Sequence, residues 1–200
     1  MATAIAPTLP RRGLVLADAI PGARTRDIAL VIGGALFTAL LAQVAIPVPP
    51  SPVPVTGQTL AVGLVGATLG ARRGTAAMLL YALLGLFLPV YAEGNSGWDV
   101  ITGASGGYII GFIFATGVVG YLAERGADRK AVTAFLSFVA AQLIVFAFGL
   151  VGLKLAVGQD WSWTVHNGFA IFIVGGVIKA IVGAAVLPSA WKLVRRFERG

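Results

Sequence analysis

The chain has 200 residues, of which 58% are hydrophobic and only 12% are charged, and its formal net charge is +7. Soluble domains carry about 25% charged residues, so this chain has too little polar surface to coat a water-soluble globule. It contains no cysteine, which excludes disulfides, thiolate metal sites and cysteine nucleophiles. The composition predicts an all-α integral membrane protein whose solvent is the lipid bilayer.

The first 27 residues have a pattern that superficially resembles a signal peptide. Arg11 and Arg12 precede a short apolar run, but Asp18 and Pro21 interrupt it. A cleavable signal needs an apolar stretch of about 7 to 15 residues. We therefore expect residues 1–27 to be a cytoplasmic N-terminal tail, followed by a transmembrane domain over residues 28–200.

Six apolar segments follow this tail, and each is a candidate for a spanning helix, which needs about 20 mainly apolar residues. In chain order they cover residues 28–46, 58–69, 75–90, 108–123, 132–157 and 169–187. The second is short, and helix tilt, local membrane thinning or a dip of the preceding segment into the bilayer would compensate. The prediction is a bundle of six transmembrane helices with structured outer loops.

The basic residues are distributed unevenly between the connectors. Thirteen of the 15 Lys and Arg residues lie before the first span, between spans two and three, between four and five, or after the sixth. Because such residues accumulate in cytoplasmic loops, both termini should be cytoplasmic. The basic residues form short clusters between apolar spans, not one patch or stripe, so nucleic acid is not an expected partner.

The first outer connector, residues 47–54, contains five prolines. Proline fixes its own φ and pushes the preceding residue toward extended conformations, so this segment should be a stiff, non-helical strap. Because proline has no N–H group, the strap brings few unsatisfied donors to an apolar surface, which suits a lid at membrane depth. A plain tight linker explains the same composition, and both interpretations stay open.

One ionisable side chain, Lys179, lies inside the last apolar span. Such a group costs about 2.5 to 3.5 kcal/mol at the bilayer centre and marks a functional site by default. Snorkelling would have to cover about 12 Å to the expected inner end of the helix. We therefore expect Lys179 to face the bundle interior and to pair with Glu93, Asp99 or a carboxylate of a ligand.

Few other polar residues are placed to face a buried pocket. They are Gln43, Thr56, Gln58, Thr59, Tyr81, Tyr91, Asn95, Gln142, His166 and Asn167. Gly106 and Gly107 would let the backbone approach a ligand beside Tyr108, although Gly107 and Gly111 also form a small-residue step typical of helix packing.

Motifs for chemistry are missing from the sequence. No spacing of histidines or carboxylates suits a metal, and no serine lies in a nucleophile elbow. No lysine follows a glycine, as a P-loop requires. We therefore expect no enzymatic activity and no cofactor, and any ATP-driven process would need partner subunits.

Three stretches carry a resemblance to a known family: "AIPVPPSPVPVTGQTLAVGLVGATLGARRG" (45–74), "YALLGLFLPVYAEG" (81–94) and "GASGGYIIGF" (103–112). From about residue 28 onward the chain resembles the BioY family of biotin transporters, the substrate-binding S components of energy-coupling factor (ECF) transporters. The resemblance implies a multi-pass protein of the bacterial cytoplasmic (inner) membrane with six helices, cytoplasmic termini and a biotin pocket near the outer surface. It also implies a transmembrane coupling protein and two ATPase subunits as partners, although some family members occur without dedicated ones.

Two details of the resemblance concern single residues. Ala35 and Ala39 match the small-residue pattern through which the first helix contacts the coupling protein, and ordinary helix packing explains them equally well. The family usually has a Pro-Gly-Asp run before the span-six lysine, whereas this chain has Val174, Gly175 and Gly176. The missing aspartate leaves Lys179 without a carboxylate one helical turn away.

The resulting hypothesis is biotin uptake together with an ECF coupling module. The expected substrate-binding residues are Gln58, Tyr91, Glu93, Asn95, Gly106, Gly107, Tyr108 and Lys179. The alternatives are a stand-alone biotin transporter, a small intramembrane enzyme or a structural membrane protein. The sequence leaves open whether the protein forms a homo-oligomer and whether it distinguishes biotin from a close precursor such as dethiobiotin.

Overall fold

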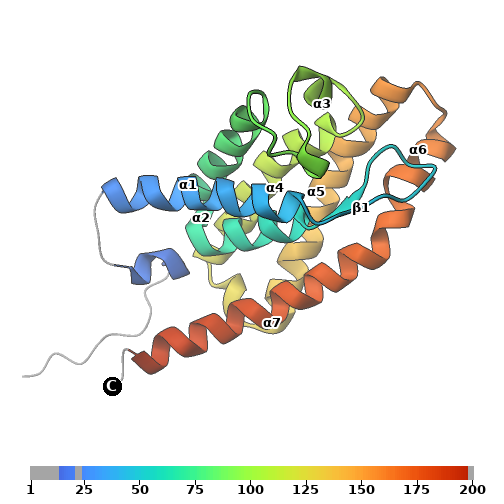
Figure 1. Ribbon diagram of the computed structural model, residues 1–200. Coiled ribbons are helices and arrows are strands. Elements are labelled where there is room, and N and C mark those ends of the chain that lie inside the picture. Colours follow the sequence, from blue (N-terminus) through green and yellow to red (C-terminus); the bar gives the residue numbers. More distant parts are fainter. Residues whose placement is uncertain (1–13, 21–23, 198–200) are drawn as a thin grey trace, which may run out of the picture.

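The computed structural model describes residues 14–20 and 24–197, so Arg11, Arg12 and Pro21 lie outside the described residues. The described part of the chain is mostly helical (Figure 1). In order, the elements are the 3-10 turn η1 (Leu16–Ala19), α1 (Arg24–Ala42), β1 (Ala45–Ile46), β2 (Val55–Thr56), α2 (Gln58–Gly85), η2 (Ala92–Gly94), α3 (Trp98–Thr102), α4 (Gly106–Glu124), η3 (Ala127–Arg129), α5 (Ala131–Val157), α6 (Trp161–Gly168), η4 (Ala170–Phe172) and α7 (Ile173–Phe197).

Helix α2 is a hairpin of two antiparallel halves. Gly70 lies between them with φ 82° and ψ 175°, a backbone conformation outside the helical region that a residue with a Cβ rarely adopts. The two halves are in close contact beyond the turn, because a Cβ atom built at Gly74 would lie only 3.3 Å from Cα of Gly66. Gln58 also hydrogen-bonds to Tyr81, whereas 23 residues of straight helix would span about 34 Å. The sequence predicted two separate spans in this region, and the structure joins them directly at Gly70.

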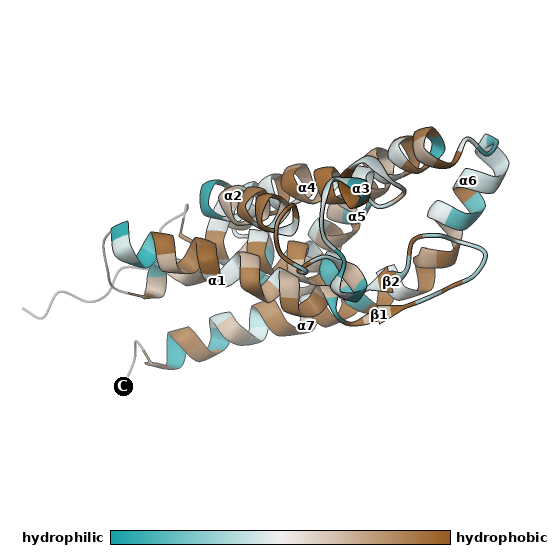
Figure 2. Ribbon diagram, turned by 45° about the horizontal axis from the view of Figure 1, so that its top comes forward, coloured by the Kyte–Doolittle hydropathy of each residue, from teal (hydrophilic) through white to brown (hydrophobic). Residues whose placement is uncertain are grey.

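Apolar residues run along most of the length of the long helices, as the hydropathy colouring of Figure 2 shows. Four segments are long and apolar enough to cross a membrane: Arg24–Ala42, Gly106–Glu124, Ala131–Val157 and Trp161–Phe197. On α1 alone, Ile28, Leu36 and Leu40 are each more than half exposed. Since a soluble protein rarely exposes contiguous apolar surface of this extent, these faces are suited to contact lipid.

The two ends of the bundle differ in what they carry. In Figure 1, η1 and the C-terminal end of α7 lie at the left, while α3, α6 and the loop between β1 and β2 lie toward the right. β1 and β2 pair antiparallel, with Ala45 opposite Thr56, and the proline-rich residues 47–54 form the loop between them. The expectation of a non-helical strap is confirmed.

Several expected boundaries are corrected. Helix α1 begins at Arg24, inside the segment 1–27 that was expected to be a tail, and α7 continues to Phe197 instead of ending at residue 187. Residues 14–20 also pack onto the bundle, because Val15 and Ala17 are buried and Asp18 pairs with Arg73. The part of the tail that the structure describes is therefore a folded cap and not a free extension.

Candidate ligand-binding site

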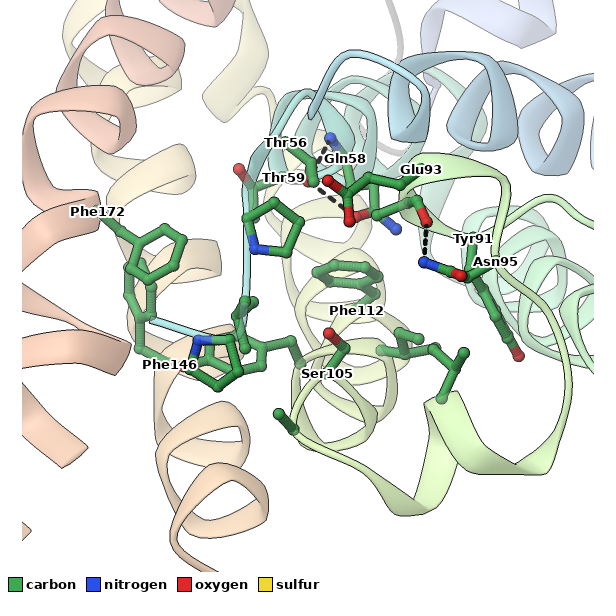
Figure 3. Close-up of a pocket in the computed structure, with 18 of the residues that line it drawn as sticks. Thr56, Gln58, Thr59, Tyr91, Glu93, Asn95, Ser105, Phe112, Phe146 and Phe172 are labelled. Atoms are coloured by element: carbon green, nitrogen blue, oxygen red, sulfur yellow. Dashed lines mark hydrogen bonds between the residues drawn. The ribbon is translucent and has the colours of Figure 1, made fainter. Parts of the chain in front are cut away.

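A cavity of about 230 Å³ lies under the strap, at the end of the bundle that carries α3 and α6. Figure 3 shows residues that line it. Its lining comes from the strap, the first turn of α2, the segment between α2 and α4, and helices α4, α5 and α7. The volume falls just below the usual range of about 300 to 1,000 Å³ for small-molecule sites. The cavity is therefore suited to one small molecule.

The strap forms one wall of this cavity. Pro52, Val53 and Pro54 all line it, and Val53 is only 7% exposed. Ser51 holds the end of the strap, since its hydroxyl donates to the carbonyl of Val53 at 3.1 Å. Of the two interpretations of the proline segment, the lid agrees with this position.

A polar wall is formed at the start of α2. The Nε2 of Gln58 donates to the hydroxyl of Tyr81 at 2.6 Å, and its Oε1 accepts from the hydroxyl of Thr56 at 2.7 Å. Figure 3 shows Thr56, Gln58 and Thr59 side by side on one edge of the cavity. These bonds satisfy both ends of the Gln58 amide, so the side chain is fixed before any ligand enters.

Lys179 comes from the second turn of α7 and lines the same cavity. Its ammonium group donates to the hydroxyl of Thr59 at 2.9 Å. None of the ion pairs within the described ranges involves Lys179. The expectation that the lysine faces the interior is confirmed, but its partner is a hydroxyl and not the expected Glu93 or Asp99.

Aromatic rings line another part of the cavity. Figure 3 shows the ring of Phe112 in the middle of the view, with Phe146 and Phe172 to one side. The ring of Tyr108 packs against both of these, with centroids 6.3 Å apart in each case. The hydroxyl of Tyr108 donates to the carbonyl of Gly168 at 2.8 Å, so this tyrosine offers a ligand its ring and not a spare donor.

The segment between α2 and α4 closes the remaining side. Tyr91 is buried, its hydroxyl donates to the carbonyl of Ala82 at 2.6 Å, and burial raises its pKa to about 12. Glu93 follows with φ 60°, a left-handed conformation unusual for a residue with a Cβ. Glu93, Asn95 and Asp99 are exposed yet line the cavity, which places both carboxylates at its mouth.

Six of the eight expected substrate-binding residues line the cavity: Gln58, Tyr91, Glu93, Asn95, Tyr108 and Lys179. The structure does not bring Gly106 and Gly107 into this group. A Cβ at Gly107 would overlap the carbonyl of Phe148 and lie 3.0 Å from Cα of Gly152 on α5. This glycine therefore allows α4 and α5 to approach closely, which is the packing role weighed above.

The structure also shows how exposed the two alanines are that were expected to contact a coupling protein. Ala35 is fully buried in the core of the chain, and Ala39 is half-buried beside it. Ala35 packs inside this bundle and has no surface to offer a partner in this conformation. For this residue the structure agrees with the alternative of ordinary helix packing.

The three phenylalanines were not predicted from the sequence. For Phe112 and Phe146 the signal was helical spacing, because residues four apart share a helix face. Phe112 follows Tyr108 by four residues on α4, and Phe146 follows Gln142 by four on α5. Extending the two expected polar positions by one turn would have found both rings.

This arrangement of side chains is suited to binding a ligand and not to making or breaking covalent bonds. Within residues 14–20 and 24–197, no group of three or more His, Asp or Glu side chains could hold a metal ion. The polar atoms lie around an aromatic hollow, with one ammonium group on a wall of the cavity and two carboxylates at its mouth. Such a site can hold a small ligand that has both an apolar ring surface and polar groups.

Curated proteins with similar sequences are biotin transporters. The chain is 38% identical over 160 residues to "Biotin transporter BioY2" of Lactococcus lactis, which covers 78% of this chain and 85% of that protein. It is 36% identical over 172 residues to "Biotin transporter BioY" of Rhizobium etli (80% and 90%), and 37% identical over 166 residues to that of Thermotoga maritima (82% and 96%).

A solved structure has the same fold. It is described as the crystal structure of the S-component for biotin from an ECF-type ABC transporter, and it matches with a TM-score of 0.74 over 88% of this chain and 93% of that one. At 23% identity, the match concerns the fold.

The model of the BioY family matches residues 13–196. Together with the apolar helices, these relatives make the chain a multi-pass integral protein of the bacterial inner membrane and not an enzyme. The resemblance inferred from the three sequence stretches is thereby confirmed: the chain belongs to the BioY family.

Proposed function

We propose that this protein binds biotin in the cavity under the strap and carries it across the membrane into the cytoplasm. The observation that carries the proposal is that six residues chosen from sequence come together around one hollow. Biotin has a bicyclic ring system, a urea group and a carboxylate on an aliphatic chain. The aromatic wall suits the ring, Gln58 and Asn95 suit the polar ring atoms, and Lys179 suits the carboxylate.

We further propose six membrane crossings over residues 28–200, with both termini in the cytoplasm. Counting the two antiparallel halves of α2 separately gives six helices with α1, α4, α5 and α7. The halves, residues 58–69 and 71–85, are about 18 and 22 Å long at 1.5 Å per residue, so they require local membrane thinning. Contacts that join Arg129 to Leu14 and to the ring of Trp191 gather basic loops at the end opposite the cavity, which supports its cytoplasmic position.

For energy, we propose an ECF coupling module made of a transmembrane coupling protein and two ATPase subunits. The chain has no P-loop of its own, and the fold matches a biotin S-component. Because Ala35 is buried, any contact by α1 would use its exposed face, with Ala39 at the edge. Whether the protein forms a homo-oligomer stays open and is to be measured on the purified protein.

Binding is tested first, with the full chain purified and placed in lipid nanodiscs. Isothermal titration with biotin should give saturable binding at one site per chain. Dethiobiotin, which lacks the sulfur and therefore the second ring, should bind more weakly because it fills the aromatic wall less completely. Absence of saturable biotin binding would overturn the proposal.

Transport is tested separately, in cells without a biotin uptake system of their own. Uptake of radiolabelled biotin should require co-expression of the coupling protein and both ATPase subunits, and should be lost when the ATPases carry inactivating substitutions. Equal uptake without any coupling module would instead assign the protein to the stand-alone alternative, with the same site.

A further inference from the structure

Gln142 on α5 forms a hydrogen bond to α7 close to Lys179, and it thereby determines which polar group lies beside the lysine. Its Nε2 donates to the backbone carbonyl of Gly176 at 2.9 Å. Gln142, Gly176 and Lys179 all line the cavity. Gly176 precedes Lys179 by three residues, so the two share one face of α7. The amide of Gln142 therefore contacts α7 about one helical turn before Lys179.

Gly176 is what makes room for this amide. A Cβ built on Gly176 would overlap Oε1 of Gln142 and lie 3.1 Å from its Cδ. A side chain at position 176 and the present position of Gln142 thus exclude each other. In this chain, the place beside the lysine is filled from α5 by an uncharged amide and not from α7.

The amide also retains hydrogen-bonding capacity. In the part of the chain that the structure describes, its single hydrogen bond uses one of the two N–H groups of Nε2, and Oε1 takes part in none. Gln142 is half-buried and faces the cavity. An acceptor oxygen and a second N–H are consequently directed at the same hollow as the ammonium group.

The charge balance around the lysine follows from this. Apart from Lys179, the ionisable side chains that line the cavity are Glu93 and Asp99, with the two tyrosines Tyr91 and Tyr108. Both carboxylates are exposed at the mouth, and neither lies within 4.0 Å of the ammonium. Because Gln142 is neutral, nothing that neighbours Lys179 on α5 or α7 cancels its charge.

We propose that Gln142 is a specificity-determining residue of this site. Its neutral amide takes the place beside Lys179 and so leaves the positive charge to be compensated by the carboxylate of the ligand. The remaining N–H and oxygen of the amide hydrogen-bond to an uncharged polar group of the same ligand. The inference rests on the proposed function, and it assigns to Gln142 the preference of this site for ligands that combine one carboxylate with an amide-like or urea-like group.

The test compares biotin with its methyl ester, which keeps the ring system and loses the charge. Affinities are measured by titration on the full chain in nanodiscs. The unmodified protein should bind the acid at least about tenfold more tightly than the ester. Gln142→Glu keeps the size of the side chain and adds a carboxylate beside Lys179, but it has no N–H group for the carbonyl of Gly176 or for the ligand. Binding of both ligands should therefore weaken, and acid binding should fall at least about tenfold more than ester binding.

Gln142→Ala removes the amide without adding charge. It should weaken acid and ester alike by about three- to tenfold, the range for a neutral hydrogen bond, and it should preserve their ratio. Gly176→Ala should act like Gln142→Ala because it displaces the same amide. The double variant should be no weaker than either single one, since both substitutions remove one contact.

Gln159→Glu is the matched control, because Gln159 is exposed in the α5–α6 connector and lies outside the cavity lining. It should leave both affinities unchanged. Should Gln142→Glu fail to fold, Gln142→Asp tests the same charge. The inference is overturned if the acid-to-ester ratio survives the added carboxylate, or if Gln142→Ala binds both ligands normally. Failure of the unmodified protein to bind biotin would instead overturn the proposed function.

Discussion

The two ends of this bundle differ in whether their charged side chains have a charged partner within the chain. At the end away from the cavity, Arg73 contacts Asp18 at 2.5 Å and Asp27 at 3.2 Å. Beside the turn at Gly70, the carboxylate of Glu124 accepts the N–H of Ala71 at 2.9 Å. At the cavity end, Lys179 has only the hydroxyl of Thr59 as its partner within the described residues.

This difference separates structural charges from functional ones. An ion pair that is complete within the chain fixes how segments meet, as Arg73 joins η1, α1 and α2. A charge left without a counter-ion in a low-dielectric interior costs free energy, and a ligand that supplies the missing charge recovers part of it. The comparison therefore predicts that substitutions at one end change stability and those at the other change binding.

The largest expected effect is that of Lys179→Ala. Removing one partner of a buried charge pair costs about 3 to 5 kcal/mol, so biotin affinity should fall at least about 100-fold. Titration of the purified variant measures this. The control is Lys154→Ala, because Lys154 contacts the backbone of Gln159 outside the cavity lining. Undiminished biotin binding by Lys179→Ala would remove the lysine from the site.

Arg73→Met should show the reverse behaviour. It removes two ion pairs whose arginine side chain is only 18% exposed, and we expect a loss of about 1 to 2 kcal/mol in the free energy of unfolding. A melting curve in detergent measures the loss, and biotin affinity should not change. Arg72→Met is the control, since Arg72 is exposed. Weakened biotin binding without any loss of stability would break the separation between the two ends.

A smaller effect on stability should depend on pH through Asp128, in the short turn between α4 and α5. Its carboxylate is buried and accepts a hydrogen bond from Nε1 of Trp191, and burial raises its pKa. A carboxyl group whose pKa is higher in the folded state stabilises that state at pH values below its ordinary pKa of about 4. That contribution is lost as pH increases through the raised pKa.

Asp128→Asn keeps an acceptor for Trp191 and stays neutral at every pH. The melting temperature of this variant, relative to the unmodified protein, should increase by a few degrees as pH is raised from about 4 to 7. Asp128→Ala provides the comparison, because it loses the hydrogen bond at all pH values. A difference between Asp128→Asn and the unmodified protein that does not change with pH would contradict the raised pKa.

The smallest expected effect concerns the strap. Replacing Pro49, Pro50 and Pro52 together by alanine should loosen this wall and increase the biotin dissociation rate by about two- to fivefold, because proline restricts the conformations that the strap can adopt. Stopped-flow or filter-binding chases measure the rate. Pro89→Ala, in an exposed connector outside the cavity lining, is the control. An unchanged rate would make the strap a linker.

Much of the site could be predicted because the relevant signals are local. A lysine within an apolar span is conspicuous whatever its neighbours are, and the same holds for the polar residues after the prolines. The positions of Gly106, Gly107 and Ala35 could not be predicted in this way. The same small residues serve a ligand or a neighbouring helix, and only the neighbour, such as Gly152 facing Gly107, distinguishes the two roles.

The sequence by itself determined the solvent of this protein, its apolar segments and the residue whose charge matters, because hydropathy and charge are properties of each stretch alone. Tertiary structure decided that residues 58–85 fold back at Gly70, that Thr59 holds the ammonium of Lys179, and that Gln142 fills the space left by Gly176. Each of these depends on which face of a helix turns inward. That choice is made by the packing of segments far apart in the chain, and no single stretch encodes it.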